Sequence, residues 1–107
     1  MPSYAFMGFD HPPHSMALRE RHRAEHRAYV LANDAAIRFA GALYDDAGNQ
    51  CGSLIVFEAD DASQVRDWLE REPFHRHGVY RDAHVIEWRL ALNRFDLTEW
   101  AQAAARN

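Results

Sequence analysis

Cysteine is nearly absent from this 107-residue sequence, and its scarcity excludes several kinds of site. The single residue, Cys51, cannot form an intrachain disulfide or a multi-cysteine zinc centre. It stands among small and polar residues at the start of an apolar run, so it fits a half-buried strand position better than a nucleophile. Folds held together by intrachain disulfides or by multi-cysteine zinc sites are therefore excluded.

Long hydrophobic runs and net positive charge are also lacking. No stretch approaches the roughly 20 apolar residues of a membrane span, and the first ten residues show no basic flank before an apolar region. We therefore expect no membrane partner and, by default, a cytoplasmic location. The formal net charge of −4 argues against a non-specific nucleic-acid binder, which needs a clustered basic face.

Signatures of nucleotide cofactors are missing too. The sequence has no glycine-rich phosphate loop, no serine nucleophile elbow and no dinucleotide fingerprint. We expect no cofactor, and ATP and NAD in particular are disfavoured. Glutamates are interleaved with the arginines of one segment, a pattern that predicts a solvated helix face. These arginines are Arg19, Arg21, Arg23 and Arg27.

Length and composition predict one globular domain covering residues 1–107, with a core from about 4 to 92. Apolar residues make up 48% and charged residues 26%, which is the usual globular balance. A domain of this size buries only about two-thirds of its unfolded surface. A second subunit that covered an apolar face would therefore add stability.

Periodicity and turn residues predict the element order β-α-β-β-α-β. Expected strands cover 4–9, 37–44, 51–59 and 84–92, and expected helices cover 16–31 and 62–72, with a short alanine-rich helix at 96–105. Ser15 and Asp61 are expected to cap the first two helices, and Gln64 three residues after Asp61 completes a capping box. In the last strand His84, Ile86 and Trp88 share one face, which predicts that this face is buried.

This order is that of the ferredoxin-like split βαβ fold, an α+β fold in which two helices cover one face of a four-stranded antiparallel sheet. The other face of the sheet would be apolar and uncovered in a monomer, and such a surface usually marks an interface or a ligand site. We therefore predict a homodimer joined through the sheet faces, with Trp88, Ile86 and Leu90 buried in the interface.

Several local patterns fall in a fixed order around these elements. They are Arg23-Ala24-Glu25-His26, Ala40-Gly41-Ala42, Gly52-Ser53, Glu72-Pro73-Phe74 and Gly78-Val79-Tyr80. With these motifs the chain resembles the YCII-related family over most of positions 4 to 90. The resemblance implies a dimeric α+β barrel with a cleft between sheet and helices.

The resemblance also implies a catalytic pair, formed by a histidine on the first helix and an aspartate before the proline. His26 matches the family histidine directly. Glu72 stands where the family pattern has aspartate, and Ala42 stands where proline is common after Ala-Gly. Glutamate keeps the carboxylate and adds a methylene, which moves the carboxylate by roughly an ångström.

His26 is the leading catalytic candidate, because a polar ring on the helix face that meets the sheet needs a hydrogen-bond partner. A carboxylate such as Glu72 would orient the ring, fix its tautomer and let it act as a general base or acid. The alternative is a core histidine bonded to a backbone carbonyl. Asp10 and Ser53, at strand ends beside the expected cleft, are candidate substrate-binding residues, with ordinary strand-end roles as the alternative.

The segment His22-Arg23-Ala24-Glu25-His26 matches the H-x-x-E-H pattern of certain zinc peptidases. The chain is far smaller than those peptidases, so we do not expect that activity. Seven histidines leave metal binding by His22 and His26, or by His75 and His77, as an alternative. Because no closed tetrahedral ligand set is evident, we expect that neither folding nor activity requires a metal.

These features predict a small cofactor-independent enzyme of the lyase, isomerase or dehalogenase type. It would act on a small-molecule metabolite by proton transfer through the pair His26 and Glu72. A non-catalytic ligand-binding or subunit-interaction module would explain the same fold. A buried His26 that faces a pocket with a carboxylate in reach would favour the enzyme.

Overall fold

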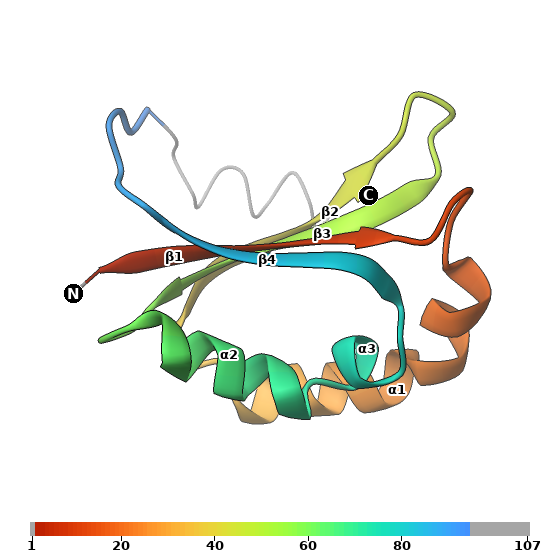
Figure 1. Ribbon diagram of the computed structural model, residues 1–107, viewed down its shortest axis with the longest axis horizontal. Helices are drawn as coiled ribbons and strands as arrows, with labels where there is room; N and C mark the ends of the chain where they lie inside the picture. The colour runs from red at the N-terminus through yellow and green to blue at the C-terminus, as the bar shows by residue number, and fades with distance from the viewer. Residues whose placement is uncertain (1, 95–107) are drawn as a thin grey trace.

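The computed structural model describes residues 2–94, and within them four strands and three helices (Figure 1). The elements are β1 (Ser3–Asp10), α1 (Met16–Ala32), β2 (Ile37–Tyr44), β3 (Gln50–Glu58), α2 (Ala62–Arg71), α3 (Pro73–Arg76) and β4 (Tyr80–Trp88). The strands form one antiparallel sheet in the order β2-β3-β1-β4. The predicted ferredoxin-like α+β fold is confirmed. The helix expected at 96–105 lies outside the described residues.

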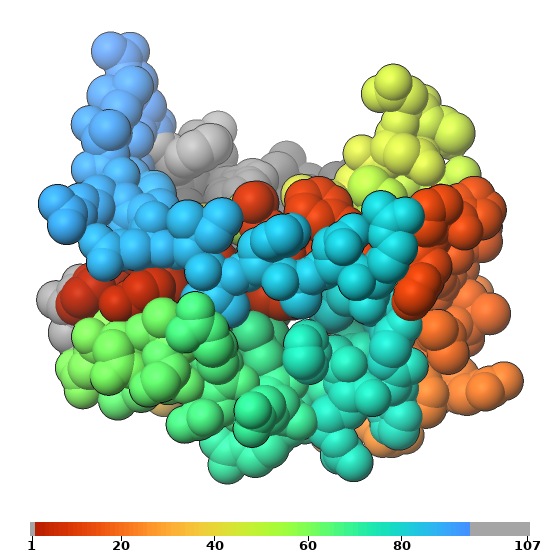
Figure 2. All heavy atoms as spheres, viewed as in Figure 1, coloured from red at the N-terminus to blue at the C-terminus, as the bar shows by residue number. Residues whose placement is uncertain are grey.

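All three helices lie on one face of the sheet, which gives the molecule two layers (Figure 1). The β2–β3 turn and the segment after β4 rise from the sheet on the opposite side (Figure 2). Between residues 2 and 94 no helix is long and apolar enough to cross a membrane.

The core lies between the sheet and the helices. On β1, Tyr4 and Phe6 point into the core, and their neighbours on β3 in the same layer are Phe57 and Ile55. From α2, whose apolar residues recur at helical spacing, Val65, Trp68 and Leu69 fill the space below these strands. Edge-to-face contact joins the rings of Phe57 and Trp68, whose centroids are 5.0 Å apart.

Strand β4 differs from its predicted bounds. It begins at Tyr80, four residues earlier than expected, and it ends at Trp88, so Leu90 lies beyond the strand. The reason is pairing: Ser3, the first residue of β1, pairs with Trp88, and Asp10, the last, pairs with Tyr80. An edge strand lasts only as long as its partner supplies hydrogen bonds.

Two helix starts also differ from prediction. Ser15 precedes α1 but its side chain caps nothing there, because its hydroxyl instead donates to the carbonyl of Val79, 2.7 Å away. The helix α3 was not expected. It begins with Pro73, a residue suited to the first helical position, and Glu72 is its N-cap. By contrast, the predicted cap of α2 is present: the side chain of Asp61 accepts a hydrogen bond from the backbone N–H of Gln64.

Two glycines in neighbouring strands provide a test of this packing. A Cβ at Gly52 would lie 2.3 Å from the carbonyl oxygen of Gly8 in the paired strand β1, whereas a Cβ at Gly41 would meet nothing within 4 Å. We predict that Gly52→Ala lowers the free energy of unfolding by about 1–3 kcal/mol, because the two backbones must separate. Gly41→Ala is the matched control and should change it far less. Chemical denaturation measures both, and equal effects would contradict the tight β1–β3 contact.

Candidate active site

A cavity of about 300 Å³ lies between α1, the strands β2 and β3, and α3. Its volume is at the lower end of the range for small-molecule sites. Small residues of β2 form one wall, and cationic side chains of α1 form another. The lining residues are Arg19, Arg23, His26, Arg27, Val30, Ile37, Ala40, Gly41, Ala42, Gln50, Ser53, Ile55 and Phe74.

The α1 wall corrects one prediction from the sequence. Its arginines were expected to form a solvated face, and Arg21, Arg23 and Arg27 are exposed, the last two at the cavity. Arg19, by contrast, is only 2% exposed. The positions 19, 23, 26, 27 and 30 follow steps of three and four residues, so they share one side of the helix. That spacing was visible in the sequence. The glutamates between the arginines favoured a helix face exposed to solvent, so the burial of Arg19 was not predicted.

His26 and Glu72 come together in the way that the sequence predicted. The Nδ1 atom of His26 is hydrogen-bonded to Oε1 of Glu72 across the contact between α1 and α3. Glu72 is 1% exposed. Its carboxylate also accepts the backbone N–H of Phe74 at 3.1 Å and that of His75 at 2.9 Å. The predicted contact is therefore present, while the catalytic role of the pair stays a prediction.

This contact determines what the imidazole can do. An ionised carboxylate only accepts hydrogen bonds, so Nδ1 carries the hydrogen and Nε2 of the neutral ring has a free lone pair. Within residues 2–94, no partner of Nε2 is present. The ring of Phe74 stacks on the imidazole, with centroids 3.9 Å apart and planes 6° from parallel. His26 is thus held in one orientation, and its free nitrogen is suited to take up a proton.

A second buried network lies beside this pair. Arg19 donates to both carboxylate oxygens of Asp10, over 2.7 and 2.8 Å, and to the hydroxyl of Ser53 over 3.2 Å. Tyr80 donates to the same hydroxyl over 2.9 Å. Two aromatic rings lie beside the guanidinium group of Arg19. The distance from its Cζ atom to the ring centroid is 5.2 Å for Phe74 and 5.5 Å for Tyr80. The paired charges are shielded from water and hold β1, β3, β4 and α1 together.

The network alters the ionisation of two of its members. Burial alone would lower the pKa of Arg19, but the hydrogen bond to Asp10, the charge that Tyr80 carries once it ionises and the charge of Asp10 outweigh burial and raise it. Burial raises the pKa of Tyr80 to about 12, although the hydrogen bond to Ser53 opposes the shift. Arg19 therefore stays a cation and Tyr80 a neutral donor throughout the physiological range.

The two candidate binding residues from the sequence have different places. Ser53 lines the cavity, whereas Asp10 does not, because its carboxylate lies behind Arg19 and is neutralised by it. The sequence-based search missed Arg19 and Tyr80. No local pattern pointed to Arg19's partner, which lies nine residues away at the end of a strand. For Tyr80, the Gly-Val-Tyr motif before the strand was the available signal.

Both the sequence and the structure of this chain match known proteins. The YCII-related domain pattern matches residues 3–89 of the chain. The chain belongs to the YCII-related family. No curated protein matches the sequence significantly.

Several solved structures resemble this YCII-related protein, and two of them are informative. One is 5-chloro-2-hydroxyhydroquinone dehydrochlorinase (TftG) from Burkholderia phenoliruptrix, in complex with 2,5-dihydroxybenzoquinone. It is 25% identical, the match covers 83% of this chain and 95% of that one, and the TM-score is 0.72. The other is Rv0793 from Mycobacterium tuberculosis, at 14% identity and a TM-score of 0.51, with 89% and 100% of the two chains covered. At that identity the second likeness concerns the fold alone.

The raised pKa of Tyr80 predicts how stability depends on pH. The folded pKa of about 12 exceeds the unfolded value of about 10, so the unfolded state loses its proton first as pH rises. The contribution is fully present below pH 10 and is lost as pH approaches 12, with a magnitude on the order of 2–3 kcal/mol. We predict that Tyr80→Phe flattens this alkaline decline in the free energy of unfolding.

Urea denaturation of the wild type and of Tyr80→Phe at several pH values measures the effect. The comparison near pH 8 serves as the reference, because there the two proteins differ only by the lost hydroxyl contacts. Parallel declines above pH 10 would show that Tyr80 ionises as readily in the folded as in the unfolded protein.

Proposed function

We propose that this protein is a small enzyme of the dehalogenase type, which removes a hydrogen halide from a compact, acidic ring compound by proton transfer through His26. One observation carries the proposal: the imidazole is fixed by Glu72 through Nδ1 and lines the cavity with Nε2 unpartnered within residues 2–94. Similarity to a dehydrochlorinase of the same fold supports the reaction class. The protein needs no oxidant, because loss of a hydrogen halide is redox-neutral overall.

The reaction begins with proton removal. Nε2 of His26 takes a proton from a ring hydroxyl and passes it to the ring carbon that bears the halogen, which gives a keto tautomer with an sp³ carbon–halogen bond. Nε2 then takes a second hydroxyl proton; the released electron pair forms a carbonyl, the ring double bond shifts, and the halide leaves with the electron pair of its bond to carbon. The proton then passes from the imidazolium to water, which restores the neutral ring.

Glu72 acts in this scheme as a positioning residue. It is buried behind the imidazole and does not line the cavity, so it works through His26. Its contact with Nδ1 keeps the hydrogen on that atom and stabilises the imidazolium that forms during proton transfer.

The charges in the cavity favour an anionic substrate. The side chains of Arg23 and Arg27 line the cavity, and neither forms an ion pair with any residue between 2 and 94. A phenolate or enolate oxygen would pair with them, and the same charges would stabilise a departing halide. The walls formed by Val30, Ile55 and Phe74 suit the flat faces of a ring.

A ligand-binding module without turnover is the alternative from a different functional class. The same arginines and apolar walls would bind an acidic ring compound without any chemistry. The two functions differ in their dependence on Nε2 of His26, because binding alone does not require a free lone pair.

A direct assay uses 5-chloro-2-hydroxyhydroquinone as substrate and 2,5-dihydroxybenzoquinone as a ligand, the two compounds associated with the dehydrochlorinase. We predict chloride release by the wild type and a loss in kcat/KM of about 100-fold or more in His26→Asn, as for the removal of a general base. Glu72→Gln should lower kcat with little change in KM, and Glu72→Asp should restore much of it. His75→Asn is the control.

The outcomes separate the two functions. Binding of the quinone with no chloride release, and with equal affinity in His26→Asn, would establish the ligand-binding module. Absence of both binding and turnover would overturn the proposed substrate class. An equal loss in Glu72→Gln and Glu72→Asp would contradict the positioning role.

We further propose that the protein is a homodimer joined through the uncovered sheet face. Ile86 is 51% exposed there and Phe9 is 37% exposed, and both side chains are apolar. Trp88 on the same face has a buried Nε1 without a partner in residues 2–94, and a second subunit could supply the acceptor. Leu90, beyond the strand, is 63% exposed and would be covered at the edge of such an interface.

We predict that light scattering finds a dimer at micromolar concentration and that Ile86→Glu converts it to a monomer, because an unpaired carboxylate cannot be buried between two apolar sheets. Arg66→Glu, on the exposed side of α2, is the control and should leave the dimer intact. A monomeric wild type, or a dimer that survives Ile86→Glu, would contradict this interface.

A further inference from the structure

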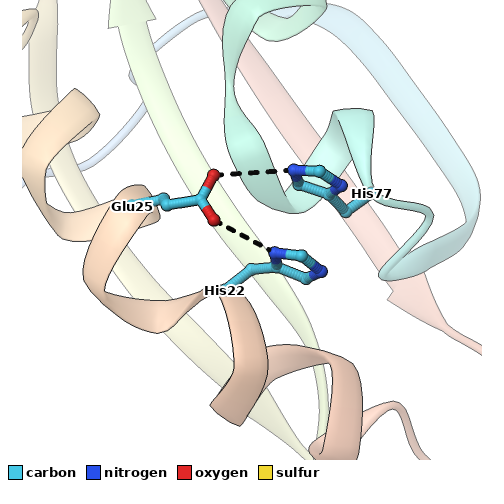
Figure 3. A group of neighbouring side chains, drawn as sticks. All are labelled: His22, Glu25 and His77. Atoms are coloured by element: carbon cyan, nitrogen blue, oxygen red, sulfur yellow. Dashed lines mark hydrogen bonds and ion pairs between the residues drawn. The ribbon is translucent and has the colours of Figure 1, made fainter.

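Three side chains with metal-binding atoms meet on the surface away from the cavity (Figure 3). His22 and Glu25 come from α1, and His77 directly follows α3. Their ligand atoms all lie within 4.8 Å of one another, and they form the only such group among residues 2–94. Their convergence depends on the tertiary structure, since His77 is distant from the other two in sequence.

The distances in this cluster fit a cation better than hydrogen bonds. Nδ1 of His22 lies 3.4 Å from Oε1 of Glu25, and Nε2 of His77 lies 3.6 Å from Oε2. Charge-assisted N–H···O bonds are about 2.7–2.9 Å long, so neither contact is a well-formed hydrogen bond. Ligands bound to zinc at about 2.1 Å in a tetrahedron are themselves about 3.4 Å apart. The two N···O distances are close to that value.

The two imidazoles stack as neutral rings do, and a shared ion requires at least one of them to turn about its side-chain torsions, because a metal lies in the plane of each imidazole that binds it. Their rings stack with centroids 3.8 Å apart and planes only 2° from parallel, and each ring directs a nitrogen toward the carboxylate of Glu25, which lies to one side of the stack (Figure 3). Two imidazolium cations would repel each other in this arrangement, whereas neutral rings can stack and can bind metal. The His22 side chain is 13% exposed and that of Glu25 is 57% exposed, so water can reach a fourth position.

We propose that His22, Glu25 and His77 bind a divalent transition-metal ion of the zinc class, with water completing the coordination. Two imidazoles and one carboxylate are a known zinc ligand set. The site differs from the H-x-x-E-H pattern of the sequence, because the second histidine is His77. His26 is engaged with Glu72 instead.

The bound ion would join α1 to the end of α3. Glu72 already joins the start of α3 to the same helix through His26. A metal at His77 would therefore hold the short segment that carries Phe74 at both ends. The ion is not needed for proton transfer, so this site is independent of the proposed function.

The test is titration of the full chain, freed of metal by dialysis against a chelator, with zinc chloride in a calorimeter. We expect one zinc ion per chain, a rise in melting temperature with zinc concentration, and intense tetrahedral absorption bands when cobalt(II) replaces zinc. His22→Ala and His77→Ala should each weaken zinc binding more than about tenfold, which is the least that loss of even an outer partner costs at metal sites. Glu25→Gln should weaken it as well.

His75→Ala is the matched control, because His75 belongs to the same short helix but not to the cluster, and it should bind zinc like the wild type. Circular dichroism of each variant shows whether the fold is retained. No zinc binding by the wild type at near-millimolar concentration would overturn the site. Binding that persists unchanged in both His22→Ala and His77→Ala, or that is lost in His75→Ala, would overturn it equally.

Discussion

The buried carboxylate of Glu72 is the group on which the arrangement of the site depends. A carboxylate removed from water is tolerated only where donors surround it. Here they are two backbone amides at the start of α3 and the imidazole of α1. The carboxylate thus caps the start of α3, brings α3 against α1 and sets the tautomer of His26. Removing it would leave three donors without their acceptor at one point of the structure.

The arginines of α1 at the cavity are of two kinds, one paired with a carboxylate and two without an ion pair in the part of the chain that the structure describes. Arg19 is neutralised by Asp10 and shielded from water, so its charge serves to hold the strands and α1 together. Arg23 and Arg27 lie one and two turns further along the same face, where the cavity is open, and they keep their charge available. A single helical stripe therefore changes along its length from a neutralised, buried arginine to two arginines that line the cavity.

The short helix α3 connects these features. Its cap is Glu72, its ring at Phe74 stacks on His26, and His77 after its end joins His22 and Glu25. Four residues are too few to be stable as a helix without partners. The segment is positioned by its contacts with α1 at both ends, and small movements of it would alter both clusters together.

The sequence by itself determined the fold class, the order of the strands and helices, and the pairing of His26 with a carboxylate, through periodicity, turn residues and the ordered motifs of the family. The fold class and the order of the elements are expressed in patterns that are local or repeat along the chain, so they can be read without coordinates. The pairing of His26 with Glu72, 46 residues away, came from the family motifs. The ends of β4, the burial of Arg19 and the existence of α3 could not be read in this way. Each depends on a partner in another element of the fold: β1 for β4, Asp10 and Ser53 for Arg19, and α1 for α3. The tertiary structure also decided which histidine joins His22 and Glu25, because a spacing pattern relates neighbours on one helix, whereas His77 reaches the cluster from another segment.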